Sequence, residues 1–409
     1  MTSLTSPSPT TLPTLDDDPF SDANLLDPSR FQAALRDAGP VVHLPGLDAC
    51  GVGRHADVNA VLRDWQDFES RSGVGRANFR REAPWRPPSL LLEADPPHHD
   101  APRAVLAKVL GPRALHRLQQ AWFADAEALV DDLLGHAGPG GVTEVDAVPA
   151  LAEAFPLRVF PDAVGLPDEG RENLLPYGDT AFNAFGPDNA LRAKGARRVA
   201  ELSGWVAGQC AREVLTDDGF GAAIWAASDR GDITPAQAPL VVRSLLTAGV
   251  DTTVHGIGAL LACLARTLAA WARLRADPTL VRLAFDEAVR LESPVQMFFR
   301  TAERDVVVGG HVVPEGEKVL VCFAAANRDP RRWEHPDTFD LDRDPSGHVG
   351  FGMGLHQCVG QHVARLEAEA LVTALLRRVG TFEPTGPGGR HLNNTLRAWA
   401  SLPVRLTPA

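Results

Sequence analysis

Hydrophobic residues recur at helical spacing along most of the chain from Leu25 onward, and Pro and Gly separate the successive runs. The pattern predicts helices over 104–135, 191–218 and 359–380, among others. A protein built mainly of helices is therefore expected, and strands should form only where the spacing changes to strict alternation.

The longest helical run begins at Thr234, where Thr-Pro-Ala-Gln has the residues of a capping box with Pro at the first helical position. The apolar spacing continues to about 276, with an expected break near 266–268. A further helix is predicted from Asp277-Pro278 to Leu291. A continuous helix of about 30 residues would span about 45 Å, the width of a domain.

Alternating residues over 41–52 predict a β-hairpin, and two short β segments are expected at 305–308 and 312–323. The stretch 71–88 is rich in Gly, Arg and Pro, which predicts a long irregular loop. No internal repeat or Ser/Gly-rich linker divides the chain. One domain over 19–409, mainly α with small β-sheets, is therefore expected.

Residues 1–18 are rich in Ser, Thr and Pro and end in three aspartates, which predicts a disordered tail. They have no apolar core and no basic leader, so we expect neither a signal peptide nor an anchor. The chain of 409 residues is 44% hydrophobic and carries a net charge of -12, which argues against nonspecific nucleic-acid binding. We expect a cytoplasmic monomer that binds neither nucleic acid nor a membrane.

The five cysteines are scattered, and no C-x-x-C pair is present, so zinc and iron-sulfur sites are not expected. Cys358 stands apart, because it follows a glycine-rich loop and precedes a predicted helix. Glycines let the loop bend and approach a ligand closely. Amides at a helix start favour a thiolate over a thiol. A lone thiolate presented in this way suits the axial position of a haem iron.

The sequence of this loop, Phe351-Gly-Met-Gly-Leu-His-Gln-Cys-Val-Gly360, resembles the F-G-x-G-x-H-x-C-x-G loop of the cytochrome P450 haem-thiolate monooxygenases. The resemblance implies that Cys358 binds the iron of haem b. It also implies a single-domain fold with the haem between the long central helix and the cysteine loop. The alternative is a buried structural cysteine in a glycine-rich turn.

A polar cluster, Ala248-Gly-Val-Asp-Thr-Thr253, interrupts the apolar central helix, and such breaks of a local rule tend to mark functional sites. A threonine hydroxyl can bond to the carbonyl one turn earlier and loosen the helix. The cluster resembles the family pattern A-G-x-[DE]-T, which implies that Asp251 supplies protons and Thr252 hydrogen-bonds dioxygen. A kinked core helix with satisfied hydroxyls is the alternative. His255, one turn after Asp251, could tune proton delivery or simply bond to Asp251 or to water.

The segment Asp95-Pro-Pro-His-His-Asp-Ala-Pro-Arg103 resembles the family's D-P-P-x-H-x-x-x-R motif. The resemblance implies that His99 and Arg103 bind the haem propionates, and that Arg300 and His356 make two further propionate contacts. Each of these residues taken alone would more often be a surface side chain.

Glu287 and Arg290 match the family's E-x-x-R pair, which implies a buried scaffold and not a catalytic role. The family completes this pair with a later arginine, for which Arg332 and Arg343 are both candidates.

No flavin or nicotinamide domain is fused to the chain, and no G-x-G-x-x-G follows a strand. The resemblance therefore implies that electrons come from a separate [2Fe-2S] ferredoxin and its NAD(P)H-dependent reductase, with O2 as the oxidant.

Several stretches, including 84–90, 182–187, 243–246 and 293–298, resemble the bacterial members that demethylate 4-methoxybenzoate. The resemblance implies an anchor for a benzoate carboxylate and a flat apolar slot for its ring. The anchor would comprise Arg86, Ser89 and Ser244, with Arg243 as a second positive charge. The slot would comprise Phe182, Phe185, Ala248, Val295 and Phe298. The alternatives are an exposed Arg86, core phenylalanines and an Arg243 that points to solvent.

The chain departs from those relatives at His255, Met297 and Met353, where Asn, Thr and a small residue are expected. The leading hypothesis is a monooxygenase of para-substituted benzoates. A peroxide-driven peroxygenase would not need the Asp251–Thr252 pair. A haem-binding sensor without turnover would not consume reductant when substrate is added.

Overall fold

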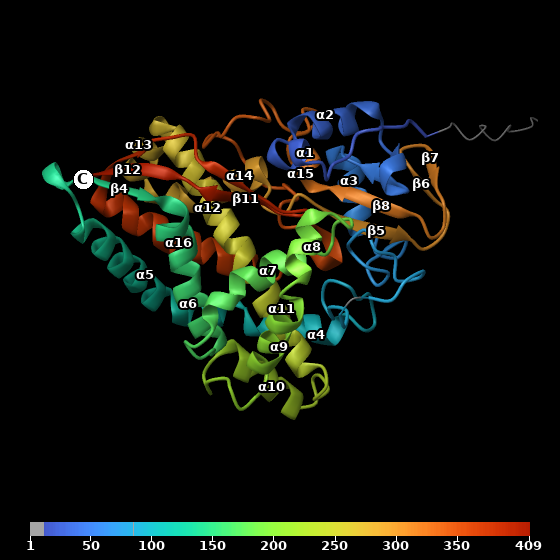
Figure 1. Ribbon diagram of the computed structural model, residues 1–409, viewed down its shortest axis with the longest axis horizontal. Helices are drawn as coiled ribbons and strands as arrows, with labels where there is room; N and C mark the ends of the chain where they lie inside the picture. The colour runs from blue at the N-terminus through green and yellow to red at the C-terminus, as the bar shows by residue number, and fades with distance from the viewer. Residues whose placement is uncertain (1–11, 85) are drawn as a thin grey trace, which may run out of the picture.

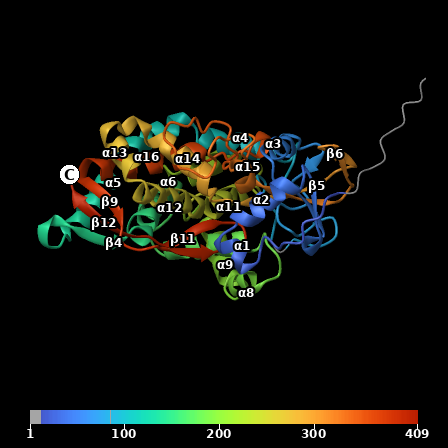
Figure 2. The same ribbon diagram turned by 90° about the horizontal axis from the view of Figure 1, so that it is seen from above.

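Two helices in line, α11 (Ala238–Ala248) and α12 (Asp251–Arg266), pass through the middle of the protein and bury apolar side chains on nearly every face of α12. The computed structural model describes residues 12–84 and 86–409 (Figure 1). Seen from above, α11 and α12 run through the interior with helices on both sides (Figure 2). The principal hydrophobic core lies around them, and it includes Leu260, Leu261 and Phe285.

The remaining helices surround this axis and have the following bounds: α1 (Asp22–Leu26), α2 (Ser29–Ala38), α3 (His55–Arg63), α4 (Asp100–Val109), α5 (Pro112–Gly135), α6 (Ala154–Val164), α7 (Leu174–Asn183), α8 (Ala190–Ala196), α9 (Val199–Gln209), α10 (Phe220–Asp229), α13 (Leu268–Ala276), α14 (Val281–Glu292), α15 (Phe323–Asn327) and α16 (Gln361–Arg378). A π-helical turn, η3 (Val148–Glu153), leads into α6.

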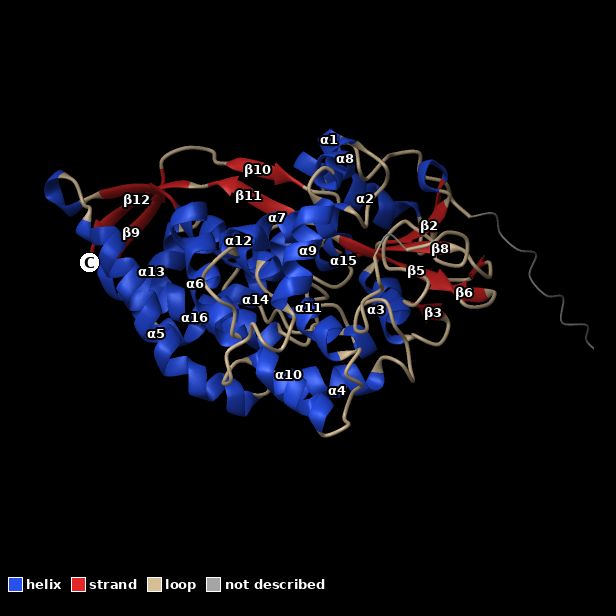
Figure 3. Ribbon diagram, turned by 60° about the horizontal axis from the view of Figure 1, so that its bottom comes forward, coloured by secondary structure: helices blue, strands red, loops and turns tan. Residues whose placement is uncertain are grey.

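Strands gather at opposite ends of the helical body (Figure 3). One end has the sheet β1-β2-β8-β5-β3, in which β8 is parallel to β2 and antiparallel to β5. Its bounds are β1 (Val42–Leu44), β2 (Ala49–Val52), β3 (Phe68–Glu69), β5 (Met297–Ala302) and β8 (Lys318–Cys322). The other sheets combine β4 (Thr143–Asp146), β12 (Pro403–Pro408) and β9 (Val379–Pro384), then β10 (Gly389–Leu392) with β11 (Arg397–Ser401), and β6 (Val306–Val308) with β7 (His311–Val313).

The predicted mainly helical fold, the 41–52 hairpin and the capping box at Thr234 are confirmed. The Thr234 amide donates to Gln237 Oε1 at 2.9 Å, and Thr234 Oγ1 accepts from the Gln237 amide at 3.3 Å. The expected break near 266–268 is present, because Thr267 leaves helical geometry. The predicted loop at 71–88 has neither helix nor strand in its described residues.

Three expectations from the sequence are wrong in part. The predicted helix 104–135 is two helices, because Gly111 before Pro112 is extended, as the residue before a proline prefers to be. The predicted helix 191–218 is also two helices, α8 and α9, separated at Arg197 and Arg198, and the second ends at Gln209. Beyond it the Thr216 amide donates to the Gly165 carbonyl. The tail was expected to reach residue 18, but the Leu15 amide donates to the His43 carbonyl at 3.0 Å. Residues 1–11 of the predicted tail lie outside the described residues.

One helical stretch within the described residues, Ala238–Arg266, is long and apolar enough to cross a membrane by length and composition alone. Its most apolar window is 78% buried within the protein. A helix buried to this extent is a core helix, and this agrees with its position along the central axis.

Candidate active site

A cavity of about 250 Å³ lies beside the junction of α11 and α12 and is lined by side chains from both ends of the chain. Cys358 and Thr252 both line it. Of the residues predicted to bind substrate or cofactor, the wall contains Arg86, Ser89, Arg103, Phe182, Arg243, Ser244, Ala248, Val295, Phe298, Arg300 and His356. Segments far apart in the sequence thus meet at one cavity, as the sequence analysis predicted.

The cysteine loop is a tight turn that delivers Cys358 to the cavity wall. Gly352 and Gly354 have φ of 67° and 68°, and a side chain on Gly354 would lie 2.6 Å from the Leu62 carbonyl oxygen, so only glycine fits. The Cys358 amide donates to the Phe351 carbonyl at 2.8 Å, and α16 starts three residues later.

The surroundings of Cys358 have opposing effects on the pKa of its thiol. Burial raises the pKa of the Cys358 thiol, and this effect outweighs the amides of Gly360 and Gln361 and the charges of Arg103 and Arg365, which lower it. The helix start acts in the predicted direction, but it does not by itself produce a thiolate in the protein alone.

Four cation or donor side chains, those of His99, Arg103, Arg300 and His356, lie near the cysteine loop. His99 is fully buried, and neither ring nitrogen has a hydrogen-bond partner among the described residues. Arg300 is 3% exposed, and the contact it makes among the described residues is to its neighbour's carbonyl, that of Phe299, at 2.9 Å. Burial lowers the pKa of Arg300 to about 10 and that of His99 to about 4.

Arg103 donates to the Gln357 carbonyl at 2.7 Å, which ties α4 to the cysteine loop. His356 is held by the Leu91 carbonyl at 3.0 Å and by Asp95 Oδ1 at 3.2 Å. Buried donors of this kind are costly unless a ligand satisfies them. The set fits a cofactor that carries two carboxylates, as haem b does, and Cys358 on the same wall fits its iron.

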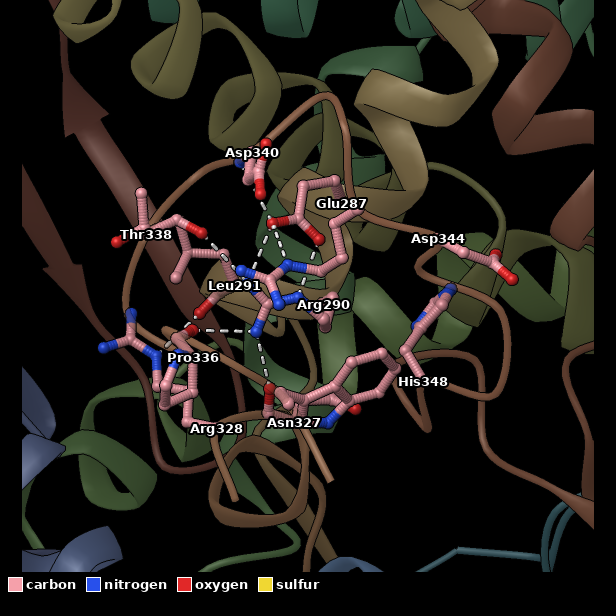
Figure 4. Close-up of polar contacts among 12 residues, drawn as sticks. Glu287, Arg290, Leu291, Asn327, Arg328, Pro336, Thr338, Asp340, Asp344 and His348 are labelled. Carbon is pink, nitrogen blue, oxygen red and sulfur yellow. Dashed lines mark hydrogen bonds and ion pairs between the residues drawn. The ribbon is translucent and has the colours of Figure 1, made fainter. Parts of the chain in front are cut away.

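The predicted scaffold of Glu287 and Arg290 is fully buried and closes in a network shown in Figure 4. Arg290 donates to Glu287 at 2.7 and 2.8 Å and to the carbonyls of Asn327, Pro336 and Thr338. The third member is Arg343, whose Nε lies 3.1 Å from Glu287 Oε1. The other candidate, Arg332, bonds to the Ser346 carbonyl instead.

This network positions the cysteine loop. Asn327 accepts from the Val349 amide at 2.7 Å through its side chain, while its own carbonyl holds Arg290. Val349 lies two residues before the cysteine loop, which begins at Phe351. The scaffold is therefore structural, as predicted, and acts on the site through the backbone of 327–349.

The central helix opens between Ala248 and Asp251, where the polar cluster lies. Thr252 Oγ1 donates to the Ala248 carbonyl at 2.7 Å, and Thr253 Oγ1 donates to the Gly249 carbonyl at 3.1 Å. These are the predicted bonds to the preceding turn. Asp251 is buried behind the wall, and its Oδ1 lies 2.9 Å from His255 Nε2.

A second polar group lines another part of the wall. Arg86 pairs with Glu93 at 3.0 Å and lies over the Phe185 ring, with its guanidinium carbon 5.9 Å from the ring centre. Arg243 donates to the carbonyls of Pro87 and Pro88 at 2.9 and 3.3 Å. Burial lowers the pKa of Arg243, and the charge of Arg86 lowers it further. Glu93 pairs with Arg86 and its charge also acts on Arg243, so the formal charge of these three side chains together is positive.

The two predicted serines of this group differ in their bonding. Ser89 Oγ accepts from the amides of Leu91 and Leu92, so its own O–H remains a donor. Ser244 Oγ donates to the Leu240 carbonyl at 3.1 Å and must turn from it to donate elsewhere.

The predicted aromatic slot forms only in part. Phe182, Val295 and Phe298 line the cavity, whereas Phe185 is absent from its wall and packs edge-on behind Phe182 and Phe298, at centroid distances of 5.9 and 5.6 Å. The expectation that Phe185 lines the slot is therefore wrong. Its ring packs edge-on against Phe182 and Phe298 and supports them.

Two of the residues at which the chain departs from the 4-methoxybenzoate-demethylating relatives, Met353 and Met297, lie in different parts of the structure. Met353 lines the cavity, and its sulfur lies 3.3 Å from an Arg63 nitrogen. Met297 is buried in a core cluster with Phe299 and Leu320, away from the wall. Sequence reasoning missed Glu93, although a lone acid after Leu90-Leu91-Leu92 was a visible signal.

Comparisons with known proteins agree with this geometry. The cytochrome P450 family pattern matches residues 227–386. Cytochrome p450 CYP199A2 of Rhodopseudomonas palustris is 56% identical over 398 residues, covering 97% of this chain and 95% of that protein. Beta-dihydromenaquinone-9 omega-hydroxylase of Mycobacterium tuberculosis is 30% identical, covering 96% of this chain and 79% of that protein.

Among solved structures, CYP108D1 from Novosphingobium aromaticivorans superimposes with a TM-score of 0.82 at 27% identity, covering 95% of this chain and 96% of that one. Cytochrome P450 CYP109Q5 from Chondromyces apiculatus gives 0.79 at 28% identity, covering 97% and 99%. The chain belongs to the cytochrome P450 family and is a monooxygenase whose cofactor is haem b.

Proposed function

We propose that this enzyme oxidises para-substituted benzoic acids, with O-demethylation of 4-methoxybenzoate as the representative reaction. The observation that carries the proposal is the pair of arginines, Arg86 and Arg243, on the wall of a mostly apolar cavity, with the single carboxylate of Glu93 beside them. A buried cation attracts an anionic ligand, and a carboxylate bound there gains charge-assisted hydrogen bonds.

The central helix sets the distance from this anchor to the reaction centre. Ser244, Ala248 and Thr252 all line the cavity and follow at four-residue intervals, so they share one helical face. At a rise of 1.5 Å per residue, Ser244 lies about 6 Å from Ala248 along the axis of α11, and Thr252 follows in the first turn of α12. A flat acid anchored near Ser244 would extend its para substituent past Ala248 toward Thr252.

The ring would lie between Phe182 and Phe298, which the edge-on Phe185 supports. Binding the carboxylate and the ring together fixes the orientation of the para group. Such orientation can lower the activation barrier by several kcal/mol. Meta isomers would bind the anchor but present their substituent to the wall.

We assign Cys358 as the haem ligand and His99, Arg103, Arg300 and His356 as the propionate partners. The fully buried His99 nitrogens, which have no hydrogen-bond partner among the described residues, and Arg300, which there bonds to the Phe299 carbonyl, support this assignment. The bound haem would supply oxygen activation and accept two electrons. Asp251 and Thr252 would handle protons at the helix opening.

In the proposed reaction one oxygen atom of O2 enters the methoxy C–H bond, and the other leaves as water with two electrons and two protons. The hemiacetal product then loses formaldehyde and leaves 4-hydroxybenzoate. Electrons would come from a [2Fe-2S] ferredoxin with its NAD(P)H-dependent reductase, in the cytoplasm, to a monomeric enzyme.

Product analysis tests this function. The purified haem protein is combined with a [2Fe-2S] ferredoxin, its reductase, NADH and 4-methoxybenzoate. Formaldehyde and 4-hydroxybenzoate should form in equal amounts, and 3-methoxybenzoate should give much less of both. Consumption of NADH without either product from the para acid, or faster product formation with peroxide alone, would contradict the proposal.

A further inference from the structure

The carboxylate of Asp251 is bonded on one side only. Its Oδ1 lies 2.9 Å from His255 Nε2, while its buried Oδ2 has no hydrogen-bond partner among the described residues. Gly178 of α7 makes room for it, because a side chain there would lie 2.8 Å from Oδ2. Among the described residues, His255 is therefore the side chain that both fixes this acid and can exchange a proton with it.

His255 also stands on the solvent side of Asp251. The His255 side chain is 11% exposed and that of Asp251 is 5% exposed. Asp251 does not line the cavity, whereas the next residue, Thr252, does. The order from solvent to cavity is thus His255, Asp251, Thr252.

The groups packed around this pair are mostly acidic. Burial raises the pKa of Glu153 on η3, and His255 lowers it. On α7, burial raises the pKa of Asp179, but the hydrogen bond from His391 of β10 and the charge of His255 lower it below its usual value. His255 thus acts electrostatically on two further carboxylates besides Asp251.

Several other charged groups on elements around α12 have their own partners, whereas the buried Glu367 of α16 has no hydrogen-bond partner among the described residues. Arg397 of β11 pairs with Glu292 at 3.2 Å, and Glu287 and Arg290 of α14 bind each other. Lys194 of α8 acts on His391, whose ring is held by Asp179 at 2.7 Å.

We propose that His255 returns protons from solvent to Asp251 during turnover, an inference that rests on the proton-handling role proposed above for Asp251 and Thr252. Each oxygenation consumes two protons with two electrons. His255 would transfer its Nε2 proton to Asp251 Oδ1, breaking the N–H bond and forming an O–H bond. The neutral acid would pass its proton toward Thr252, and the imidazole would take another from water. Histidine suits this task because its imidazole exchanges protons near neutral pH.

A role limited to holding Asp251 in place makes a different prediction. In His255→Gln the side-chain amide can still donate a hydrogen bond to Asp251 but cannot carry a proton. A purely positioning histidine would therefore be replaced well by glutamine, and a proton carrier would not. His136→Gln is the matched control, since His136 is exposed and bonds to the Asp132 carbonyl.

Product formation by the reconstituted enzyme is measured over pH 6–9 in H2O and D2O. A positioned proton donor contributes roughly 10²–10⁴-fold, and because water can still reach Asp251 slowly, we expect His255→Gln to lose about tenfold in rate. The solvent isotope effect should increase, the fall in rate toward high pH should disappear, and the substrate dissociation constant should stay unchanged. His136→Gln should match wild type throughout.

A second measurement does not depend on turnover. Histidine-¹⁵N NMR of the diamagnetic ferrous carbonyl form follows the His255 ring as a function of pH. Asp251→Asn should change the chemical shift of the ring nitrogen that faces position 251, because that nitrogen loses its contact with a carboxylate. This holds even if His255→Gln folds poorly.

An unchanged rate and isotope effect in His255→Gln would overturn the inference, and so would His255 ring signals that do not change in Asp251→Asn. If Asp251→Asn itself turns over like wild type, the proposed role of Asp251 fails. If Asp251→Asn is slow while His255→Gln is normal, only the role of His255 fails.

Discussion

Thr252 donates its hydroxyl to the Ala248 carbonyl at 2.7 Å, across the point where the central helix opens. The bond satisfies a carbonyl that the helix would otherwise use one turn later. Because Thr252 also lines the cavity, the same hydroxyl lies at the helix opening and at the wall of the reaction chamber.

Removing this hydroxyl should separate electron consumption from product formation. In Thr252→Ala we expect normal substrate binding and continued NADH oxidation, with product per NADH falling severalfold and hydrogen peroxide rising to match. Thr252→Ser keeps a hydroxyl and should stay close to wild type. The measurement is product and peroxide per NADH, and equal yields in Thr252→Ala and wild type would rule out the role of the hydroxyl.

Cys358 should be the only cysteine whose loss changes the haem spectrum. Cys358→Ala is expected to lose the thiolate-type spectrum of the ferrous carbonyl complex, because no other cysteine lines the cavity within the described residues. Cys263→Ala, a buried cysteine of α12, is the control and should retain it. Retention of that spectrum in Cys358→Ala would refute the ligand assignment.

The Glu287 scaffold should dominate stability. Removing one partner of a fully buried pair leaves an unpaired charge, so Glu287→Gln should lower the free energy of unfolding by about 3–5 kcal/mol. Glu369→Gln breaks an exposed pair with Arg282 and should cost about 0–1 kcal/mol. Denaturant titration of both variants checks the difference. A Glu287→Gln loss as small as that of Glu369→Gln would mean that the network is not needed.

His391 should make stability depend on pH. The hydrogen bond to Asp179 raises the pKa of His391 above its usual value of 6.5, so the folded protein binds this proton more tightly than the unfolded chain. Its contribution is full below pH 6.5 and is lost as pH rises through the raised value. The difference in unfolding free energy between wild type and His391→Asn should therefore shrink from about pH 6 to about pH 9. A difference in unfolding free energy that grows from about pH 6 to about pH 9 would contradict this prediction.

Much of the site could be predicted because its motifs are local. The glycines before Cys358 require a tight turn, and the Thr234 capping box depends on four adjacent residues. The back-bond of Thr252 likewise involves one helical turn.

The rest depends on how distant segments meet. Arg343 and Arg332 are equal candidates in sequence, and only the path of the 327–349 segment brings Arg343 to Glu287. Glu93 neutralises Arg86 because the loop 86–93 folds back on itself. Phe185 turns away from the cavity because its neighbours' rings pack against it edge-on.

The most direct test of the proposed substrate class compares an acid with its amide. Ferric enzyme is titrated with 4-methoxybenzoate and with 4-methoxybenzamide, and the Soret band reports binding. Wild type should bind the acid far more tightly. Arg86→Ala or Ser244→Ala should each cost the acid about 1.5–3 kcal/mol, or about ten- to a hundredfold in affinity. Neither change should affect the amide much.

Glu93→Gln is the matched control, because it removes the anion that competes for Arg86 and should tighten binding of the acid. The account predicts this ranking, with the acid bound most tightly by Glu93→Gln, then wild type, then Arg86→Ala. Equal affinity of wild type for the acid and the amide would contradict it.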